Sequence, residues 1–94
     1  MTLRGTRILL VGGTSGLGLA VAQGIAARGA TAIVASRRAA TVAAALDVLP
    51  TGSEGHSVDV NDDQSVINLV QAAGPIDHLV YTVGEALQLG RVSQ

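Results

Sequence analysis

A glycine-rich turn between an apolar run and a helical pattern is the feature that most constrains this sequence. Arg7 begins a short apolar run, the glycines follow with the spacing Gly12-x-x-x-Gly16-x-Gly18, and apolar residues then recur at three- and four-residue steps. Gly12 suits the positive φ of a sharp exit from a strand, Gly16 allows a pyrophosphate to approach the backbone, and Gly18 allows close helix packing. Backbone N–H groups and a helix N-terminus would then face the same anion. The turn therefore predicts a phosphate-binding site.

The spacing of the glycines excludes one well-known class of phosphate site. The sequence contains no Lys, so it cannot hold the Gly-Lys-Ser/Thr ending of a P-loop. The spacing also differs from the G-x-G-x-x-G of the long dinucleotide-binding families. Taken alone, such a turn is equally compatible with a tight connection that binds nothing.

The hydrophobic pattern alternates between strands and helices along the whole chain. Strands are predicted at 7–11, 31–35, 56–60 and 76–83, and helices at 15 or 16 to 28, 39–48 and 62–73. Such an array predicts one α/β domain over residues 1–94, with a parallel sheet of order 3-2-1-4 and helices on both faces. The strand order reverses beside the first strand, so a ligand is expected at that strand's carboxyl end.

Finer features of these elements are also predicted. Gly29 is expected to cap the first helix, and residues 61–63 are expected to supply the N-cap and acidic first turn of the third. The buried face of the third helix is predicted to consist of Val66, Ile67, Val70 and Ala73. Residues 85–94 are expected to form a polar tail, so that the sheet is truncated after its fourth strand. That would leave residues 79–83 as a bare edge, which predicts a homodimer or a complementing chain there.

Composition limits the classes of function. A formal net charge of −1 gives no basic surface for nucleic acid, and the absence of Cys excludes disulfides and cysteine-based metal sites. The apolar run near the N-terminus stops at Gly12, too short for a signal peptide or a membrane span. We therefore expect a cytoplasmic chain with no membrane partner. His56 and His78 are expected to be ordinary strand residues, because no ligand cluster surrounds them, and no metal site is predicted.

Three motifs together resemble the N-terminal half of a short-chain dehydrogenase/reductase. The family's Thr-Gly-x-x-x-Gly-x-Gly matches residues 11–18, its adenine-contacting Asp-Val matches Asp59-Val60, and residues 76–80 match the strand before its Asn-Asn-Ala-Gly. The resemblance covers essentially the whole chain. It implies a Rossmann-type sheet, a bound nicotinamide dinucleotide and an oxidoreductase that moves a hydride between this cofactor and a carbonyl or alcohol.

The sequence departs from the family at two of these motifs and lacks another. Val11 stands where the family has Thr, and Tyr81-Thr82-Val83 stands where it has Asn-Asn-Ala. The family's catalytic Ser and Tyr-x-x-x-Lys pair are absent from these residues, and Tyr81 cannot replace that pair because Glu85 follows four residues later. No catalytic residue is therefore predicted within this chain, and the chain alone is expected to be inactive.

The end of the second predicted strand distinguishes the two nicotinamide cofactors. An NAD site needs an acid about 20 residues after the glycine turn, whereas an NADP site uses Arg. Ser36, Arg37 and Arg38 stand there, and a guanidinium can hold a 2′-phosphate through paired charge-assisted hydrogen bonds. NADP(H) is therefore predicted over NAD(H), with Arg38 as a weaker contact. The absence of an acid also argues against S-adenosylmethionine methyltransferases. Alternatively, Arg37 and Arg38 are a solvated helix entrance.

The predicted cofactor contacts lie at four strand ends. They are Gly12, Thr14, Ser15, Gly16, Leu17 and Gly18 in the turn, Ser36, Arg37 and Arg38 after the second strand, Asp59 and Val60 after the third, and Thr82 and Gly84 at the fourth. Thr14 and Ser15 can equally stabilise the turn itself. Asp59 can accept a hydrogen bond from the adenine amino group or cap the following helix. A stand-alone nucleotide-binding or dimerisation module without catalysis is the alternative function, and a gene remnant is a third.

Overall fold

A computed structural model of the chain describes residues 3–12, 16–83 and 86–91, with the backbone alone for 82, 83 and 86–91. Strands and helices alternate as the hydrophobic pattern predicts, and a final strand follows. The elements are β1 (Arg7–Val11), α1 (Gly16–Ala27), β2 (Thr31–Ser36), α2 (Ala39–Asp47), β3 (Glu54–Ser57), α3 (Asp63–Ala73), β4 (His78–Val83) and β5 (Ala86–Arg91). Among the described residues, none of the helices has the length and apolar character needed to cross a bilayer.

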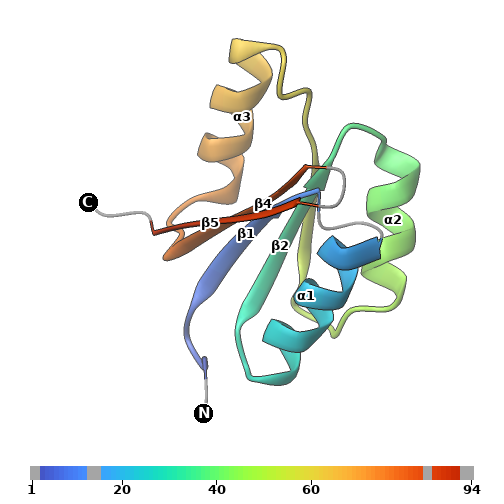
Figure 1. Ribbon diagram of the computed structural model, residues 1–94, viewed down its shortest axis with the longest axis vertical. Coiled ribbons are helices and arrows are strands. Elements are labelled where there is room, and N and C mark those ends of the chain that lie inside the picture. Colours follow the sequence, from blue (N-terminus) through green and yellow to red (C-terminus); the bar gives the residue numbers. More distant parts are fainter. Residues whose placement is uncertain (1–2, 13–15, 84–85, 92–94) are drawn as a thin grey trace.

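The five strands form one sheet in the order β3-β2-β1-β4-β5 (Figure 1). Strand β1 is the centre of the parallel part, where Leu9 pairs with Ile33 of β2 and with Leu79 of β4. The predicted parallel order 3-2-1-4 is thus confirmed. The chain leaves β1 toward β2 on one side and returns to β4 on the other, which is the order reversal that creates a crevice at the strands' carboxyl ends.

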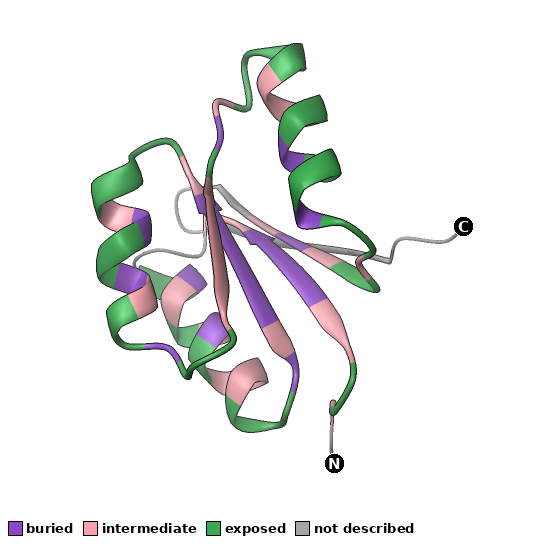
Figure 2. Ribbon diagram, turned by 180° about the vertical axis from the view of Figure 1, so that it is seen from behind, coloured by how far each residue is buried: buried purple, intermediate pink, exposed green. Residues whose placement is uncertain are grey.

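Helices cover both faces of the sheet, and each face has its own apolar core. Helices α1 and α2 pack on one face through Ala22, Val42 and Ala45, while α3 packs on the other through Leu69 and Ala73. Figure 2 shows the buried residues gathered in the central strands and on the inner sides of the helices. Many of the helix residues in contact with the sheet are Ala or Gly, so the helices lie close to the strands.

Turn and cap residues behave largely as the sequence predicts. Gly29 has a φ of 97° and closes α1 together with Ala30, whose N–H donates to the carbonyl of Ile25. Asp62 is the N-cap of α3, where its side chain accepts a hydrogen bond from the backbone N–H of Gln64. These local signals were readable because glycine at positive φ and aspartate at an N-cap each satisfy a backbone requirement.

The third strand lies earlier than predicted. Residues 56–60 were expected to form it, whereas β3 spans Glu54–Ser57. Of the three predicted strand residues after Ser57, only Val58 is buried. Gly55 explains the difference, because a side chain there would collide with α2: a Cβ would lie 2.5 Å from Cγ1 of Val42 and 2.8 Å from Cδ1 of Leu46. The glycine allows α2 to press on the edge strand, although glycine is a poor indicator of a strand in sequence.

The expected polar tail is wrong, as is the expectation that the sheet is truncated after β4. Residues 86–91 form β5, which pairs antiparallel with β4 from His78↔Arg91 to Val83↔Ala86. This hairpin covers the edge of β4, so the predicted homodimer or complementing chain at a bare β4 edge has no such edge to pair with. The alternation of Leu87 and Leu89 with smaller or polar residues was a period-two signal for this strand.

The buried face of α3 also differs from the prediction. Leu69 and Ala73 are buried and Val66 is half-buried, whereas Ile67 and Val70 are 48% and 52% exposed. Leu69 belongs to the inner stripe because it lies three and four residues from Val66 and Ala73. Two adjacent apolar stripes are present on this helix, and the sequence pattern alone does not tell which one faces the sheet.

Arg7 ties the amino-terminal ends of the strands together. Its guanidinium pairs with Glu54 of β3 at 2.8 Å and donates to the carbonyls of Ala73 and Pro75 at the end of α3. Its backbone N–H donates to Oδ2 of Asp77. The hydrogen bond and charge of Arg7 lower the pKa of the Glu54 carboxyl below its ordinary value of 4.5. This network holds the end of the sheet opposite the crevice.

Because the Glu54 carboxylate is favoured in the folded state, its contribution to stability exists above pH 4.5 and is lost as the pH falls through the lowered pKa. We expect Glu54→Gln to reduce the free energy of unfolding at pH 7 by up to about 1 kcal/mol, since the pair is about one-third exposed. The difference should shrink on acidification in urea denaturation. Asp47→Asn, which removes a charge from the end of α2, serves as the control. A pH-independent difference for Glu54→Gln would contradict this account.

Candidate functional site

A hollow of about 190 Å³ lies at the carboxyl ends of the parallel strands. It is where the strand-order reversal predicts a ligand, and residues from four segments of the chain contribute to its wall. The lining residues are Val11, Gly12, Ser36, Arg37, Val58, Asp59, Val60, Asn61 and Tyr81. We call this hollow the strand-end pocket.

The exit from β1 forms the floor of the strand-end pocket. Gly12 has a φ of 89°, and its N–H donates to the carbonyl of Ala35 at 2.8 Å, so it stays bound to β2 while the chain turns. Gly16, with a φ of 57°, begins α1, and Gly18 is buried in that helix. The positive φ values at Gly12 and Gly16 explain why glycine is needed at both positions.

The ends of β2 and β3 are held together beside this floor. The N–H of Val58 donates to the carbonyl of Ser36 at 2.8 Å, and Oγ of Ser57 donates to the carbonyl of Arg37 at 3.1 Å. These bonds fix the backbone from which the Arg37 side chain extends into the pocket wall. Within the described part of the chain, the Arg37 guanidinium forms no ion pair. Its positive charge is therefore available at the pocket.

A hydrogen-bonded loop after β3 presents Asp59. Oδ1 of Asp59 accepts a hydrogen bond from the N–H of Asn61 at 3.0 Å, and the N–H of Asp59 donates to Oγ of Ser65 at 2.8 Å. The alternative in which Asp59 caps α3 is wrong, because Asp62 occupies that position. The carboxylate of Asp59 instead stabilises the loop and lines the strand-end pocket.

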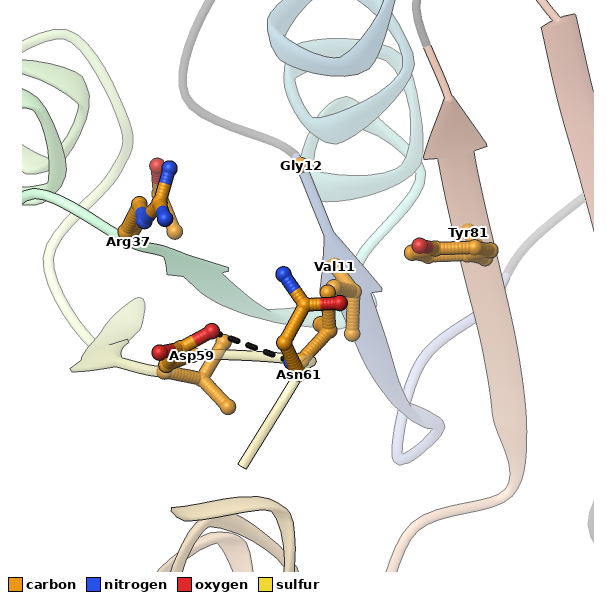
Figure 3. A pocket seen from close by; sticks show the side chains of 9 residues that line it. Val11, Gly12, Arg37, Asp59, Asn61 and Tyr81 are labelled. Atoms are coloured by element: carbon orange, nitrogen blue, oxygen red, sulfur yellow. Dashed lines mark hydrogen bonds between the residues drawn. The ribbon is translucent and has the colours of Figure 1, made fainter. Parts of the chain in front are cut away.

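Tyr81 forms the opposite wall. It stands on β4 as the register partner of Val11, the last residue of β1. Figure 3 shows Arg37 and Tyr81 on opposite sides of the pocket, with Val11 and Asn61 between them. The pocket is thus bounded by a guanidinium on one side and a phenol on the other, with a glycine backbone between.

The structure brings together some of the predicted contacts and not others. Five of them line the strand-end pocket: Gly12, Ser36, Arg37, Asp59 and Val60. Gly16, Leu17 and Gly18 belong to the start of α1 and do not line it, and Leu17 is 46% exposed. Thr82 is described as backbone within β4, while Thr14, Ser15 and Gly84 lie outside the described residues.

Arg38 does not reach the pocket wall. It is the N-cap residue of α2, and its carbonyl accepts a hydrogen bond from Oγ1 of Thr41 at 2.8 Å. Sequence reasoning missed Val11, Val58 and Asn61 as lining residues, and it placed Tyr81 at the cleft mouth or strand edge with its role left open. The strand register explains Tyr81, because it places this residue beside the exit of β1.

Comparisons with known proteins agree with this geometry. The family model for short chain dehydrogenases matches residues 6–93. The chain belongs to this family. A short-chain dehydrogenase/reductase of Malbranchea aurantiaca, malC, is 34% identical over 101 residues, which cover 92% of this chain. Members of the family are oxidoreductases that bind nicotinamide dinucleotide cofactors.

Solved structures show the same likeness. A short chain dehydrogenase/reductase family protein superposes with a TM-score of 0.84 at 36% identity, over 89% of this chain and 36% of its own. The NADP complex of RhlG from Pseudomonas aeruginosa has a TM-score of 0.80 at 28% identity, over 88% of this chain and 36% of its own. The chain spans 38% of the length of the malC relative.

The loop that carries Asp59 depends on Ser65. Replacing Ser65 with Ala removes the hydroxyl oxygen that accepts a hydrogen bond from the N–H of Asp59, and leaves this half-buried N–H unpaired. We expect Ser65→Ala to lower the free energy of unfolding by about 1 kcal/mol, the usual contribution of such a hydrogen bond. Urea denaturation measures it. Ser53→Ala is the control, and equal effects of the two substitutions would argue against an anchored loop.

Proposed function

We propose that this chain is the NADP(H)-binding portion of a short-chain dehydrogenase/reductase and that the strand-end pocket receives the adenosine side of the cofactor. The observation that carries the proposal is the chemistry at the end of β2. There Ser36 and Arg37 line the pocket, and the guanidinium has no acidic partner in the described part of the chain.

The 2′-phosphate of NADP distinguishes it from NAD. An Arg in this position offers two parallel N–H donors to a phosphate, and the Ser36 hydroxyl can add a third. An NAD site would instead place a carboxylate at the end of β2 for the ribose 2′-hydroxyl. Among the described residues that line the pocket, the one carboxylate is that of Asp59, which follows β3 and accepts a hydrogen bond from its own loop. The charge at β2 therefore favours the phosphorylated ribose.

The remaining residues fit the rest of the adenosine moiety. Val58 and Val60 give the pocket an apolar side suited to a purine, and Asp59 between them is a hydrogen-bond acceptor for an exocyclic amino group. Gly12 lets a diphosphate approach the backbone, and the N-terminus of α1 begins at Gly16. Thr14, Ser15, Thr82 and Gly84 remain proposed contacts on the strength of the motif alone.

Arg37→Ala tests the choice of cofactor. We expect it to weaken NADPH binding by about 10- to 100-fold, which corresponds to the loss of roughly 1.5–3 kcal/mol from charge-assisted hydrogen bonds. NADH binding, which involves no 2′-phosphate, should change much less. Isothermal titration calorimetry measures both. Arg38→Ala removes an equal charge one residue away and should have the smaller effect; equal losses for NADPH and NADH in Arg37→Ala would overturn the assignment.

The residues of this chain bind and orient the cofactor, and the nicotinamide supplies the hydride. The sequence has no Lys, so these 94 residues do not contain the family's Tyr-x-x-x-Lys pair. The proton transfer that accompanies hydride transfer to a carbonyl needs such a positioned acid. We therefore infer that the 94-residue chain binds cofactor without turning it over.

The absence of turnover is directly measurable. We expect the purified chain, saturated with NADPH and supplied with a panel of ketones and aldehydes, to show no substrate-dependent loss of NADPH absorbance. A full-length member of the family, assayed in parallel, is the positive control. Carbonyl reduction by the 94-residue chain would show that its own residues supply the catalytic groups.

A further inference from the structure

Tyr81 is the single residue of the Phe, Tyr and Trp class in this sequence, and it lies where β4 passes the exit of β1. Its register partner is Val11, and the two Cα atoms belong to neighbouring hydrogen-bonded strands, which lie about 4.8 Å apart. Both residues line the strand-end pocket. Tyr81 therefore borders the turn at Gly12 from the side opposite to β2.

The hydroxyl of Tyr81 is available to a ligand. No hydrogen bond joins it to another described residue, and the Val11 side chain beside it has no polar atom that could form one. Figure 3 shows the phenol extending from β4 toward Val11 and the pocket. The tyrosine ring is only half-buried, and a tyrosine hydroxyl at such a border normally pairs with a polar group.

The order of the strands limits which part of a dinucleotide can reach this hydroxyl. Across the pocket, Asp59 follows β3, Arg37 follows β2, Gly12 follows β1 and Tyr81 lies on β4. With the purine beside Asp59 and the 2′-phosphate at Arg37, the diphosphate crosses near Gly12. Tyr81 is then the next side chain, on the side away from the purine.

We propose that the Tyr81 hydroxyl donates a hydrogen bond to the diphosphate of the bound dinucleotide. This inference rests on the proposed function, because it requires the adenosine side to lie between Asp59 and Arg37. A phenol is a good donor to an anionic phosphate oxygen, and a bond to an ionised acceptor is stronger than one between neutral groups. Tyr81 is then a cofactor-binding residue that β4 supplies and that its pairing with β1 places beside Gly12.

Two of the residues that depart from the family motifs, Val11 and Tyr81, lie next to each other in the sheet. Val11 and Tyr81 stand where the family has Thr and Asn, and the register makes them direct partners. An apolar side chain and a phenol replace two side chains that can each donate and accept hydrogen bonds. The only side-chain donor left in the pair is the Tyr81 hydroxyl, and Tyr81 lines the pocket.

The test compares NADPH with 2′-AMP, which carries the 2′-phosphate and the adenosine but no diphosphate. Tyr81→Phe keeps the ring and removes the donor. We expect this variant to raise the dissociation constant for NADPH by about 5- to 10-fold and to leave that for 2′-AMP unchanged. Thr51→Val, which removes a hydroxyl at the opposite end of the sheet, should change neither constant. Isothermal titration calorimetry on the whole chain gives all the values.

A second measurement uses the wild-type chain, whose single tyrosine gives one set of ring signals when labelled with ¹³C. The Cζ signal should shift with NADP⁺ and stay in place with 2′-AMP. An unchanged NADPH constant in Tyr81→Phe, equal losses for both ligands, or a Cζ signal indifferent to NADP⁺ would overturn the inference and leave the proposed function standing. If neither ligand binds the wild-type chain, the proposed function fails and this inference fails with it.

Discussion

The parallel hydrogen bonding of β1 between β2 and β4 is the constraint on which the rest of the structure depends. It brings the carboxyl ends of these strands to one edge of the sheet, and the chain must leave each of them there. Gly12 makes the exit from β1, at a φ of 89° and with its N–H still bonded to the carbonyl of Ala35. Residues that are far apart in sequence, such as Arg37, Asp59 and Tyr81, therefore meet around one hollow.

The two ends of the sheet differ in how they are held. At the amino-terminal end, Arg7 joins β1 to Glu54, to the end of α3 and to Asp77 through direct bonds. At the carboxyl end, backbone bonds hold the loops, while the Arg37 guanidinium and the Tyr81 hydroxyl remain without partners among the described residues. Polar groups without a partner in the protein can bind a ligand. The amino-terminal end of the sheet therefore contributes stability, and the carboxyl end offers groups for binding.

Sequence reasoning found the features that a single residue type determines. The glycine turn, the Asp62 cap and the order of β3, β2, β1 and β4 follow from φ requirements, capping and chain connectivity. It missed features that depend on a neighbour distant in sequence. Gly55 concealed the true start of β3, because glycine is uncommon in strands and only the closeness of Val42 explains its presence there. The sequence placed Tyr81 at the cleft mouth or strand edge, and the register with Val11 was needed to choose between the two. The hairpin strand β5 was overlooked although its alternation was visible.

The central claim is that the strand-end pocket holds a dinucleotide and prefers the one with a 2′-phosphate. A thermal-shift titration of the wild-type chain with NADPH and with NADH tests it most directly, because a ligand of the folded state stabilises it by RT ln(1 + [L]/Kd). The account predicts that NADPH raises the melting temperature in a saturable manner and that NADH at the same concentration raises it less. Equal shifts, or no shift with either cofactor, would contradict it.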